Sequence, residues 1–334
     1  MDFGANVWGS HAGVSTRRDR IAGDFARMAA LGFTVVRWFV FTDGRSAIVY
    51  DDRGFPAGVD AHLFADVDAA LEIAGGVGIR LNLVLLDHRW MFDDVPDVLA
   101  DPATGELLQT RLPKGRARIL RTGRGREALF ANVIAPLVGR YGSAGARADL
   151  APHLFAFEFM NEPDFIVEEW EAHLSSHVRA PLGFSALAEI VEALSTLVHS
   201  RTSALCTMSC ARLDNLWAWD SPELNLDFLQ VHSYPDARGP HADRDIYGVP
   251  ASSLGVNCPV VLGEFPGNAP QQHPPGASPP AWTLDDYLTF ALEQGYAGAW
   301  PWSFSGTDAY GSFPEEPLRT FARLHPELVN TRAR

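Results

Sequence analysis

The stretch Leu154–Phe165, with the sequence LFAFEFMNEPDF, decides how this chain is expected to fold. The run up to Met160 is apolar except for Glu158, which is the pattern of a strand buried on both faces of a parallel sheet. Pro163 cannot continue a central strand, so Glu162 lies at the carboxyl end of this one. A carboxyl group against an apolar wall has a raised pKa, which suits it to donate a proton near neutral pH. The alternative is that Glu162 only caps a helix or forms an ion pair.

Seven other segments have the same buried character, and most of them are separated by segments of helical pattern. The predicted strands, with the opening stretch in fourth place, are Phe3–Trp8, Phe33–Phe41, Ile79–Asp87, Ala204–Cys210, Leu226–Pro235, Pro259–Gly267 and Tyr296–Ser305. The predicted helices are Arg17–Leu31, Asp60–Ala74, Glu127–Tyr141, a region from Glu168, Phe184–His199, one that begins after Thr283, and Glu315–Leu324. Ser15 or Thr16 is expected to cap the first helix, and Thr283 with Asp286 the one before Gly295. Eight strands in this order predict an α/β fold, a single (β/α)₈ TIM barrel over residues 1–334.

A long connection, Met91–Gly123, follows the third strand and shows no clear periodicity. It is acidic at first and then strongly basic, with the sequence RLPKGRARILRTGRGR at 111–126. A connection of this length inside a compact domain is usually a lid or an insertion. The basic part can contact an acidic partner, but a solvated loop is the favoured interpretation. Its glycines formally match a dinucleotide fingerprint, which we discard because no convincing strand precedes them.

Composition excludes several classes of protein. A length of 334 residues is usual for an α/β barrel, and a hydrophobic content of 47% supplies a large core. A net charge of −14 argues against general binding of nucleic acid. No apolar run approaches the ~20 residues that a membrane span needs. We therefore expect neither nucleic acid nor membrane as a partner.

The cysteines and the first residues of the sequence indicate the cellular compartment in which the protein is expected. Cys206, Cys210 and Cys258 have no metal-ligand spacing and are predicted to be free thiols in a reducing compartment. The first ten residues, MDFGANVWGS, do not resemble a signal peptide. We expect a cytoplasmic protein, with a secreted protein that has lost its signal as the alternative.

Polar and aromatic residues collect at the predicted carboxyl ends of the strands, where barrels of this kind place their active sites. In chain order they are Arg37, His88, Asn161, Glu162, His232, Tyr234, Glu264 and Trp302. Each has a simpler explanation; a lone buried arginine such as Arg37, for example, can serve a structural ion pair. The common position of all eight at the same end of their strands favours a functional site.

Two glutamates dominate this set. Strands four and seven are nearly opposite in an eight-stranded barrel, so Glu162 and Glu264 are expected to face each other. Two facing carboxyl groups cannot be equivalent, and one is expected to be protonated while the other is ionised. At a separation of about 5–5.5 Å the ionised one can attack carbon directly, with retention of configuration. Arg37 and Tyr234 are placed to stabilise an ionised Glu264.

The complete set resembles clan A retaining glycoside hydrolases, most of all glycoside hydrolase family 5, which contains cellulases and β-mannanases. The motifs that carry the resemblance are Arg37, His88, Asn161-Glu162-Pro163, His232-Ser233-Tyr234, Glu264 and Trp302. The resemblance implies that Glu162 is the acid/base, that Glu264 is the nucleophile, and that the site uses neither a metal nor an organic cofactor. Asn161 and Trp302 are expected to contact the sugar. Trp8, Trp90 and Trp282 are further candidates for sugar binding, with core or surface positions as the alternative.

The expected activity is therefore hydrolysis of β-linked glucosides or mannosides. Oligosaccharides are the first choice of substrate, and endo-acting cleavage of polymeric mannan or cellulose is the alternative. We expect a monomer or a weak homo-oligomer with a carbohydrate as its partner. A non-catalytic sugar-binding barrel would have lost one carboxylate, and an aldolase would need a Schiff-base lysine, whereas the single lysine, Lys114, lies in the long connection. A metal-dependent hydrolase would need clustered ligands that the sequence does not space correctly.

Overall fold

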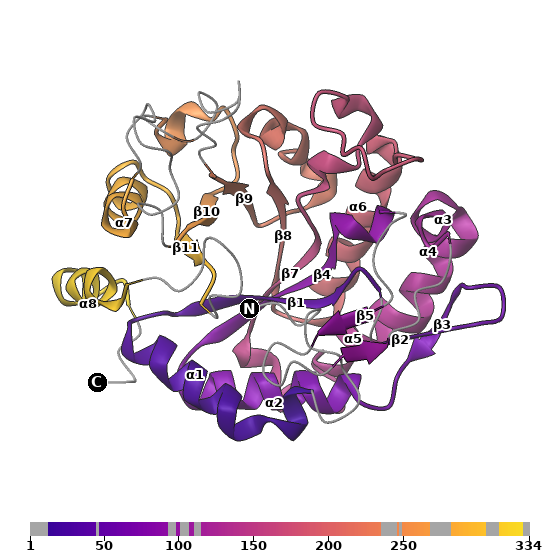
Figure 1. The fold of residues 1–334 in the computed structure, drawn as a ribbon, viewed down its shortest axis with the longest axis horizontal. Coiled ribbons are helices and arrows are strands. Elements are labelled where there is room, and N and C mark those ends of the chain that lie inside the picture. Colours follow the sequence, from indigo (N-terminus) through magenta and orange to yellow (C-terminus); the bar gives the residue numbers. More distant parts are fainter. Residues whose placement is uncertain are drawn as a thin grey trace.

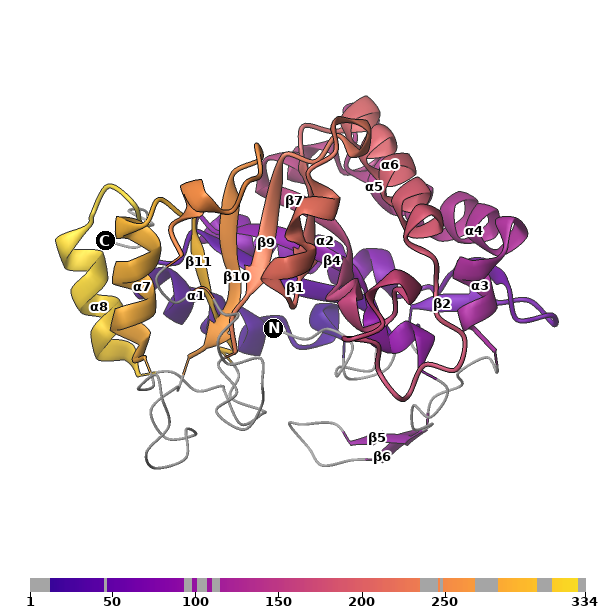
Figure 2. The same ribbon diagram turned by 90° about the horizontal axis from the view of Figure 1, so that it is seen from above.

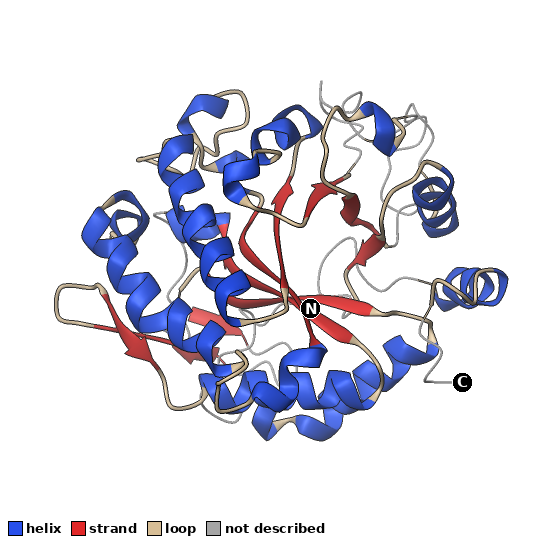
Figure 3. Ribbon diagram, turned by 180° about the vertical axis from the view of Figure 1, so that it is seen from behind, coloured by secondary structure: helices blue, strands red, loops and turns tan. Residues whose placement is uncertain are grey.

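A parallel sheet that curls around a central axis forms the core of the protein, with helices around its outside (Figures 1 and 3). The computed structural model describes residues 13–44, 47–92, 98–100, 107–109, 115–234, 246, 249–267, 282–304 and 314–329. Within these residues the sheet has seven strands, in the order β1-β4-β7-β8-β9-β10-β11. They are β1 (Val35–Thr42), β4 (Arg80–Asp87), β7 (Leu154–Asn161), β8 (Leu205–Cys210), β9 (Phe228–His232), β10 (Val260–Pro266) and β11 (Ala299–Trp302).

These are seven of the eight predicted strands, and every neighbouring pair is parallel, as a barrel requires. The remaining predicted strand, Phe3–Trp8, lies outside the described residues. Burial explains why the apolar runs were good predictors. In β7 and β10, for example, all residues after the first two are buried, because the strands have helices on one side and the barrel interior on the other.

The main helices cover the outer face of the sheet. They are α1 (Arg18–Ala30), α2 (Leu63–Gly76), α3 (Ala117–Arg121), α4 (Gly123–Leu129), α5 (Ala135–Arg140), α6 (Phe184–Arg201), α7 (Leu284–Glu293) and α8 (Glu315–Leu324). α1 buries Ile21, Phe25 and Met28, which share one helical face. Within the described residues, none of the helices has the combination of length and apolar character needed to cross a membrane.

Two details of the helix predictions are wrong, and a third needs a refinement. The predicted helix Glu127–Tyr141 is helical up to Arg140, but it contains a π-helical turn at Phe130–Ile134 between α4 and α5. The region from Glu168 forms only a short 3₁₀ turn, Glu168–Trp170. Neither Ser15 nor Thr16 caps α1: the Ser15 amide donates to Asp66 of α2 at 2.8 Å.

The long connection after β4 is more ordered than predicted. It begins with a 3₁₀ turn, His88–Met91, and contains two short antiparallel strands, β5 (Val98–Ala100) and β6 (Leu107–Gln109). Figure 2 shows this pair standing apart from the seven-stranded sheet. Helix α3 follows, within the predicted loop. A second small hairpin, β2 (Ile48–Tyr50) with β3 (Pro56–Val59), was also not predicted.

The described part of the basic run is helical and not a loop, and it buries Arg116, whereas Arg118, Arg121 and Arg124 are exposed, as predicted for a solvated segment. Arg116 is buried and donates to the carbonyl oxygens of Arg89 at 2.9 Å and Phe92 at 2.7 Å. The guanidinium groups of Arg118 and Arg124 lie 4.7 and 4.9 Å from the centre of the Phe55 ring. These arginines therefore hold the turn after β4 and the β2–β3 hairpin in place.

The start of α7 has the predicted capping box, which gives a stability prediction. The Thr283 hydroxyl accepts from the Asp286 amide at 3.2 Å, and the Asp286 carboxylate accepts from the Thr283 amide at 2.7 Å. Thr283→Ala should lower the free energy of unfolding by about 1 kcal/mol, because the Asp286 N–H in the first turn of the helix loses its acceptor. Thermal unfolding followed by circular dichroism measures the loss. Thr289→Ala, on the exposed face of the same helix, is the matched control and should not destabilise; equal melting temperatures for the two variants would contradict the cap.

Candidate active site

The carboxyl ends of the parallel strands bring six of the predicted site residues into one network of contacts. Parallel strands end on the same side of a sheet, so residues that terminate different strands meet there. The six are His88, Asn161, Glu162, His232, Tyr234 and Glu264. Arg37 joins this network from inside the barrel, because it is the third residue of β1 and not at the predicted strand end. Trp302, the last residue of β11, lies beside this network.

The two glutamates face each other as predicted. One carboxylate oxygen of Glu162, one of Glu264 and a ring nitrogen of His232 all lie within 4.8 Å of one another. This separation is close to the ~5 Å that lets one carboxylate attack a carbon atom while the other delivers a proton to its leaving group. It leaves too little room for a water molecule between carboxylate and substrate, as an inverting reaction would need.

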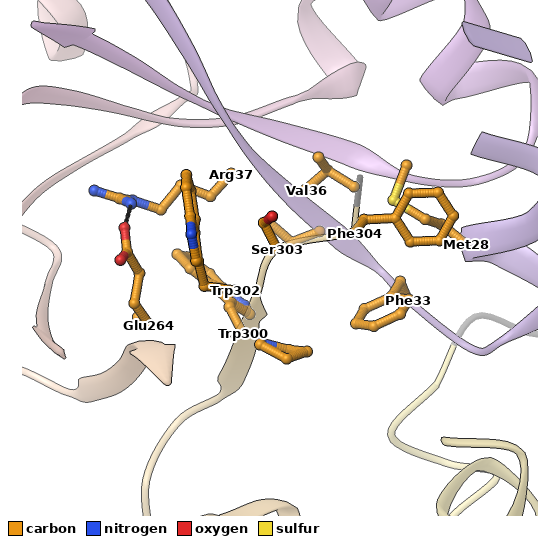
Figure 4. Close-up of a pocket in the computed structure, with 12 residues that line it drawn as sticks. Met28, Phe33, Val36, Arg37, Glu264, Trp300, Trp302, Ser303 and Phe304 are labelled. Carbon is orange, nitrogen blue, oxygen red and sulfur yellow. Dashed lines mark hydrogen bonds and ion pairs between the residues drawn. The ribbon is translucent and has the colours of Figure 1, made fainter. Parts of the chain in front are cut away.

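Glu264 is held in β10 by two donors. Arg37 Nη1 donates to Oε1, a contact that is visible in Figure 4, and the Tyr234 hydroxyl donates to Oε2 at 2.9 Å. The carboxylate is buried, with 7% of the residue exposed. Burial raises the pKa of Glu264, and the charge of Glu162 adds to the rise, whereas His232, Arg37 and Tyr234 favour its ionised form.

Arg37 is the cation at the centre of the site. Its guanidinium makes two parallel bonds to Glu158, Nε to Oε2 at 2.8 Å and Nη2 to Oε1 at 2.6 Å, and Nη2 also donates to Asn161 Oδ1 at 2.7 Å. Burial alone would lower the pKa of Arg37, but Glu158 and Glu264 raise it above its ordinary value, so Arg37 is permanently charged. Such a bidentate pair fixes both the position and the plane of the guanidinium.

Glu158 is the site residue that sequence reasoning missed. It is completely buried in β7, where Asn82 Nδ2 at 3.2 Å and Gln230 Nε2 at 2.8 Å donate to it as well as Arg37. Burial raises the pKa of Glu158, but Arg37 more than compensates and the net shift is downward. A signal was present in the sequence: Arg37 and Glu158 each interrupt an apolar run, and buried charges are found in pairs.

Glu162 has an unusual backbone, with φ 47° and ψ 57° in the left-handed region. Its amide donates to Ser209 Oγ at 3.1 Å, and its Oε1 lies 2.9 Å from His232 Nδ1. His88 Nδ1 is 3.8 Å from Oε2. Burial raises the pKa of Glu162, but the hydrogen bond and charge of His232, followed by His88, lower it to about 2. Burial also lowers the pKa of His232, and the charges of Glu264 and Glu162 reverse that effect, so that it is raised overall.

Considered one at a time, these shifts favour a proton on Glu264, which is opposite to the roles that the resemblance implies. Groups this close titrate as a set, however, and the protons belong to the set. Glu264 is paired with an arginine that never loses its charge, whereas Glu162 is paired with a histidine that can. We therefore assign the negative charge to Glu264 and the shared proton to the 2.9 Å contact between His232 and Glu162.

Aromatic side chains border the glutamates. Trp302 is half-buried, makes an edge contact with Phe39 at 6.0 Å, and with Glu264 lines a small hollow (Figure 4). On the side of Glu162, the His88 ring packs against Phe165 at 4.9 Å and Phe92 at 5.4 Å. These two phenylalanines were not predicted, because nothing in their sequence context distinguishes them from core residues.

Two of the three further tryptophan candidates, Trp90 and Trp282, lie outside this arrangement. Trp90 is completely buried in the core, close against Gly44, so the prediction that it binds sugar is corrected: no ring face is open to a ligand. Trp282 packs on Tyr287 and Phe290 of α7, at 5.2 and 4.7 Å. Trp8 lies outside the described residues.

Glu162, His232 and Glu264 also have donor atoms close enough together to hold a metal ion. The Arg37 guanidinium, bonded directly to Glu264, would repel a cation bound there, and His232 Nδ1 is already directed at Glu162. We therefore assign the three residues to holding and transferring protons and not to binding a metal ion.

The fold and the site together define an α/β barrel with a carboxylate pair at the carboxyl edge of its sheet. No protein-family model matches the sequence. The chain is 23% identical over 323 residues to a mannan endo-1,4-beta-mannosidase of Mytilus edulis, a match that covers 90% of this chain and 79% of that protein. The structure is similar to a β-1,4-mannanase of the sea hare Aplysia kurodai, with a TM-score of 0.70 and 16% identity, covering 95% of this chain and 88% of the other. It is also similar to an endo-1,4-β-mannanase of Eisenia fetida, with a TM-score of 0.67 and 18% identity, covering 100% and 91%.

These similarities confirm the predicted barrel. They also confirm, at the level of the fold, the resemblance to the glycoside hydrolase family that was noted from the sequence.

Proposed function

We propose that this protein is a retaining β-glycosidase that hydrolyses β-linked mannosides or glucosides through Glu162 and Glu264. The observation that carries the proposal is the placement of their carboxylate oxygens within 4.8 Å of each other at the carboxyl edge of the sheet. That separation suits a double displacement. A non-catalytic binding barrel would have no need of two opposed carboxylates, one bonded to a buried arginine and the other to a buried histidine.

In the first step the ionised Glu264 attacks the anomeric carbon, and Glu162 gives its proton to the glycosidic oxygen as the bond to the leaving group breaks. The product is a glycosyl ester of Glu264. In the second step Glu162 takes a proton from a water molecule, which attacks the same carbon and releases Glu264. Two inversions leave the configuration of the sugar unchanged.

The remaining residues have supporting roles. Arg37 and Tyr234 hold Glu264 in place and favour its negative charge. His232 holds the Glu162 carboxyl group in place through their 2.9 Å contact and shares its proton. Asn161, fixed by Arg37 and Asp87, has an amide group that can donate to a sugar hydroxyl, and Trp302 offers an apolar ring face to the pyranose.

The names of the similar proteins support mannosides over glucosides. The relatives from Mytilus edulis, Aplysia kurodai and Eisenia fetida are all named for cleavage of β-1,4-mannan. We therefore place β-1,4-linked mannooligosaccharides first. Endo-acting cleavage of mannan polymer is the second form of the proposal, because two of these names specify endo action.

A substrate panel with product NMR tests the proposal. Aryl β-mannoside, β-glucoside, β-galactoside and β-xyloside are compared with mannooligosaccharides and soluble mannan. We expect hydrolysis of the mannosides, with the β-anomer as the first product in the proton spectrum, because double displacement retains configuration. An α-anomer would exclude the mechanism, and binding of mannooligosaccharides without turnover would favour a non-catalytic barrel.

A further inference from the structure

The turn that presents Glu162 is attached to the neighbouring strand by side chains, and one of them has no role in the chemistry above. We propose that Asp164 is a positioning residue, whose buried carboxylate ties the Glu162 turn to the end of β8 and holds the acid/base in its working position. This inference rests on the proposed function and extends it to a residue outside the catalytic set.

The backbone alone does not hold Glu162. Pairing between β7 and β8 runs from Ala156–Leu205 to Glu158–Thr207 and ends four residues before Glu162. Beyond that point two other bonds continue the connection. The Glu162 amide donates to Ser209 Oγ at 3.1 Å, and the Ala211 amide donates to Asp164 Oδ2 at 2.8 Å. They therefore replace the missing backbone ladder where the chain turns.

Asp164 also reaches a third segment. Its Oδ1 accepts from Asn215 Nδ2 at 2.6 Å, and Asn215 belongs to the 3₁₀ turn Leu213–Trp219 that follows β8. The residue is completely buried. One carboxylate therefore joins the exit of β7, the exit of β8 and the next turn. The backbone of Glu162 is in a sparsely populated conformation, which persists only where the surroundings enforce it.

This carboxylate has no opposing positive charge among the described residues. No ion pair joins it to a basic side chain there, and the titratable groups that interact with it are Glu162 in the same turn and the Cys210 thiol of β8. Burial raises the pKa of Asp164 to about 6; the Asn215 and Ala211 bonds oppose the rise and the Glu162 charge adds to it. Both oxygens accept a hydrogen bond in the ionised form. A proton converts one of them into a donor. The Ala211 amide cannot accept this proton, and Asn215 accepts it only after its side-chain amide has turned over, so protonation changes the contacts that hold the turn.

The pH profile of the hydrolysis tests this coupling. In Asp164→Asn an amide N–H replaces one accepting oxygen at all pH values, so Asn215 must turn its amide over or lose its bond. We expect kcat to fall by roughly 10- to 100-fold, the range expected for a misplaced catalytic group. The acid limb of kcat should move to lower pH, because the group that protonates near pH 6 is gone. Asn215→Ala removes a donor that favours the charged form, so its acid limb should move to higher pH. A purely structural role would lower activity without these opposite displacements, and acid limbs unchanged in both variants would overturn the proposal.

Asp220→Asn is the matched control. Asp220 also accepts from two backbone amides, those of Asn257 at 2.7 Å and Cys258 at 3.0 Å, but these precede β10 at the edge of the sheet opposite to the active site. This variant should melt at a lower temperature and keep the acid limb of the wild type. If it shifted the limb as Asp164→Asn does, the specific role of Asp164 would be refuted.

Thermal stability as a function of pH separates this inference from the proposed function. The pKa of Asp164 is higher in the folded protein than in the unfolded chain, so its proton stabilises the fold. This stabilisation is fully present at pH values below the pKa of the unfolded chain and is lost as the pH rises through about 6. The melting temperature of the wild type minus that of Asp164→Asn should therefore fall between pH 4 and pH 7. A constant difference would refute the titration of Asp164, even if the protein hydrolyses glycosides. Absence of hydrolysis by the wild type would refute the proposed function and leave this readout standing. If Asp164→Asn does not fold, both measurements are made on Asn215→Ala. In that variant the pKa of Asp164 should rise further, so the melting temperature should depend more steeply on pH than in the wild type.

Discussion

Replacing Glu264 with alanine should reduce the hydrolysis of an aryl β-mannoside by roughly 10⁴- to 10⁶-fold, the scale on which loss of a catalytic nucleophile is felt in other enzymes. The variant retains the proton donor Glu162 but has no group that can attack the anomeric carbon. Added azide should occupy the space that the carboxylate leaves and attack in a single displacement. The product is then an α-mannosyl azide, which proton NMR identifies.

The matched control is Glu162→Ala. With a good aryl leaving group it should still form the glycosyl ester on Glu264, because such a group departs without a proton, and azide should then release a β-mannosyl azide. The two variants therefore give azides of opposite configuration if the roles are as proposed. Wild-type turnover by Glu264→Ala would overturn the assignment of the nucleophile, and exchanged products would reverse the two roles.

The second large effect is expected from Arg37→Met. Arg37 is the common partner of Glu158 and Glu264, and its loss leaves both carboxylates buried without a cation. Breaking a buried ion pair by removing one partner typically costs about 3–5 kcal/mol. Because the pKa of Glu158 is lowered in the folded protein, its ionised form stabilises the wild type at pH values above the ordinary pKa of a glutamate. That stabilisation is lost as the pH falls. The difference in melting temperature between wild type and variant should therefore narrow toward pH 4.

A double variant separates packing from charge in this prediction. Arg37→Met with Glu158→Gln removes the uncompensated charge at Glu158, so part of the lost stability should return. Activity should not return, because Glu264 still lacks its cation. If the double variant is no more stable than the single one, Arg37 and Glu158 are not coupled in the way that their two hydrogen bonds indicate.

The sequence was sufficient to predict the barrel because strands buried on both faces leave long apolar runs, and because a polar residue at the end of such a run is easily seen. Glu162 and Glu264 were predicted for this reason. Glu158 was noted only as an interruption of the run, since a pattern along one strand does not show which charge on a different strand lies opposite. Arg37 and Glu158 are 121 positions apart in the chain and meet only through the curl of the sheet.

Short and irregular elements could not be predicted from patterns of apolar residues. The strands β2, β3, β5 and β6 have three or four residues, too few for a period to be visible. Trp90 stands in a 3₁₀ turn, where the sequence does not show whether a ring faces the cleft or the core; here it faces the core. Arg116 was predicted to be solvated because its charge was considered without the two carbonyl groups that accept from it.

The Arg37 network also acts on the transition state of the reaction. A single guanidinium faces Glu158 and Glu264, while Glu162 and His232 share a proton between them, so these side chains together keep one uncompensated negative charge in a region with little water. During glycosidic cleavage the ring carbon and ring oxygen acquire the positive character of an oxocarbenium ion. A fixed electrostatic field of the opposite sign, present before the sugar arrives, favours that species over the neutral ground state and needs no rearrangement of the protein to do so.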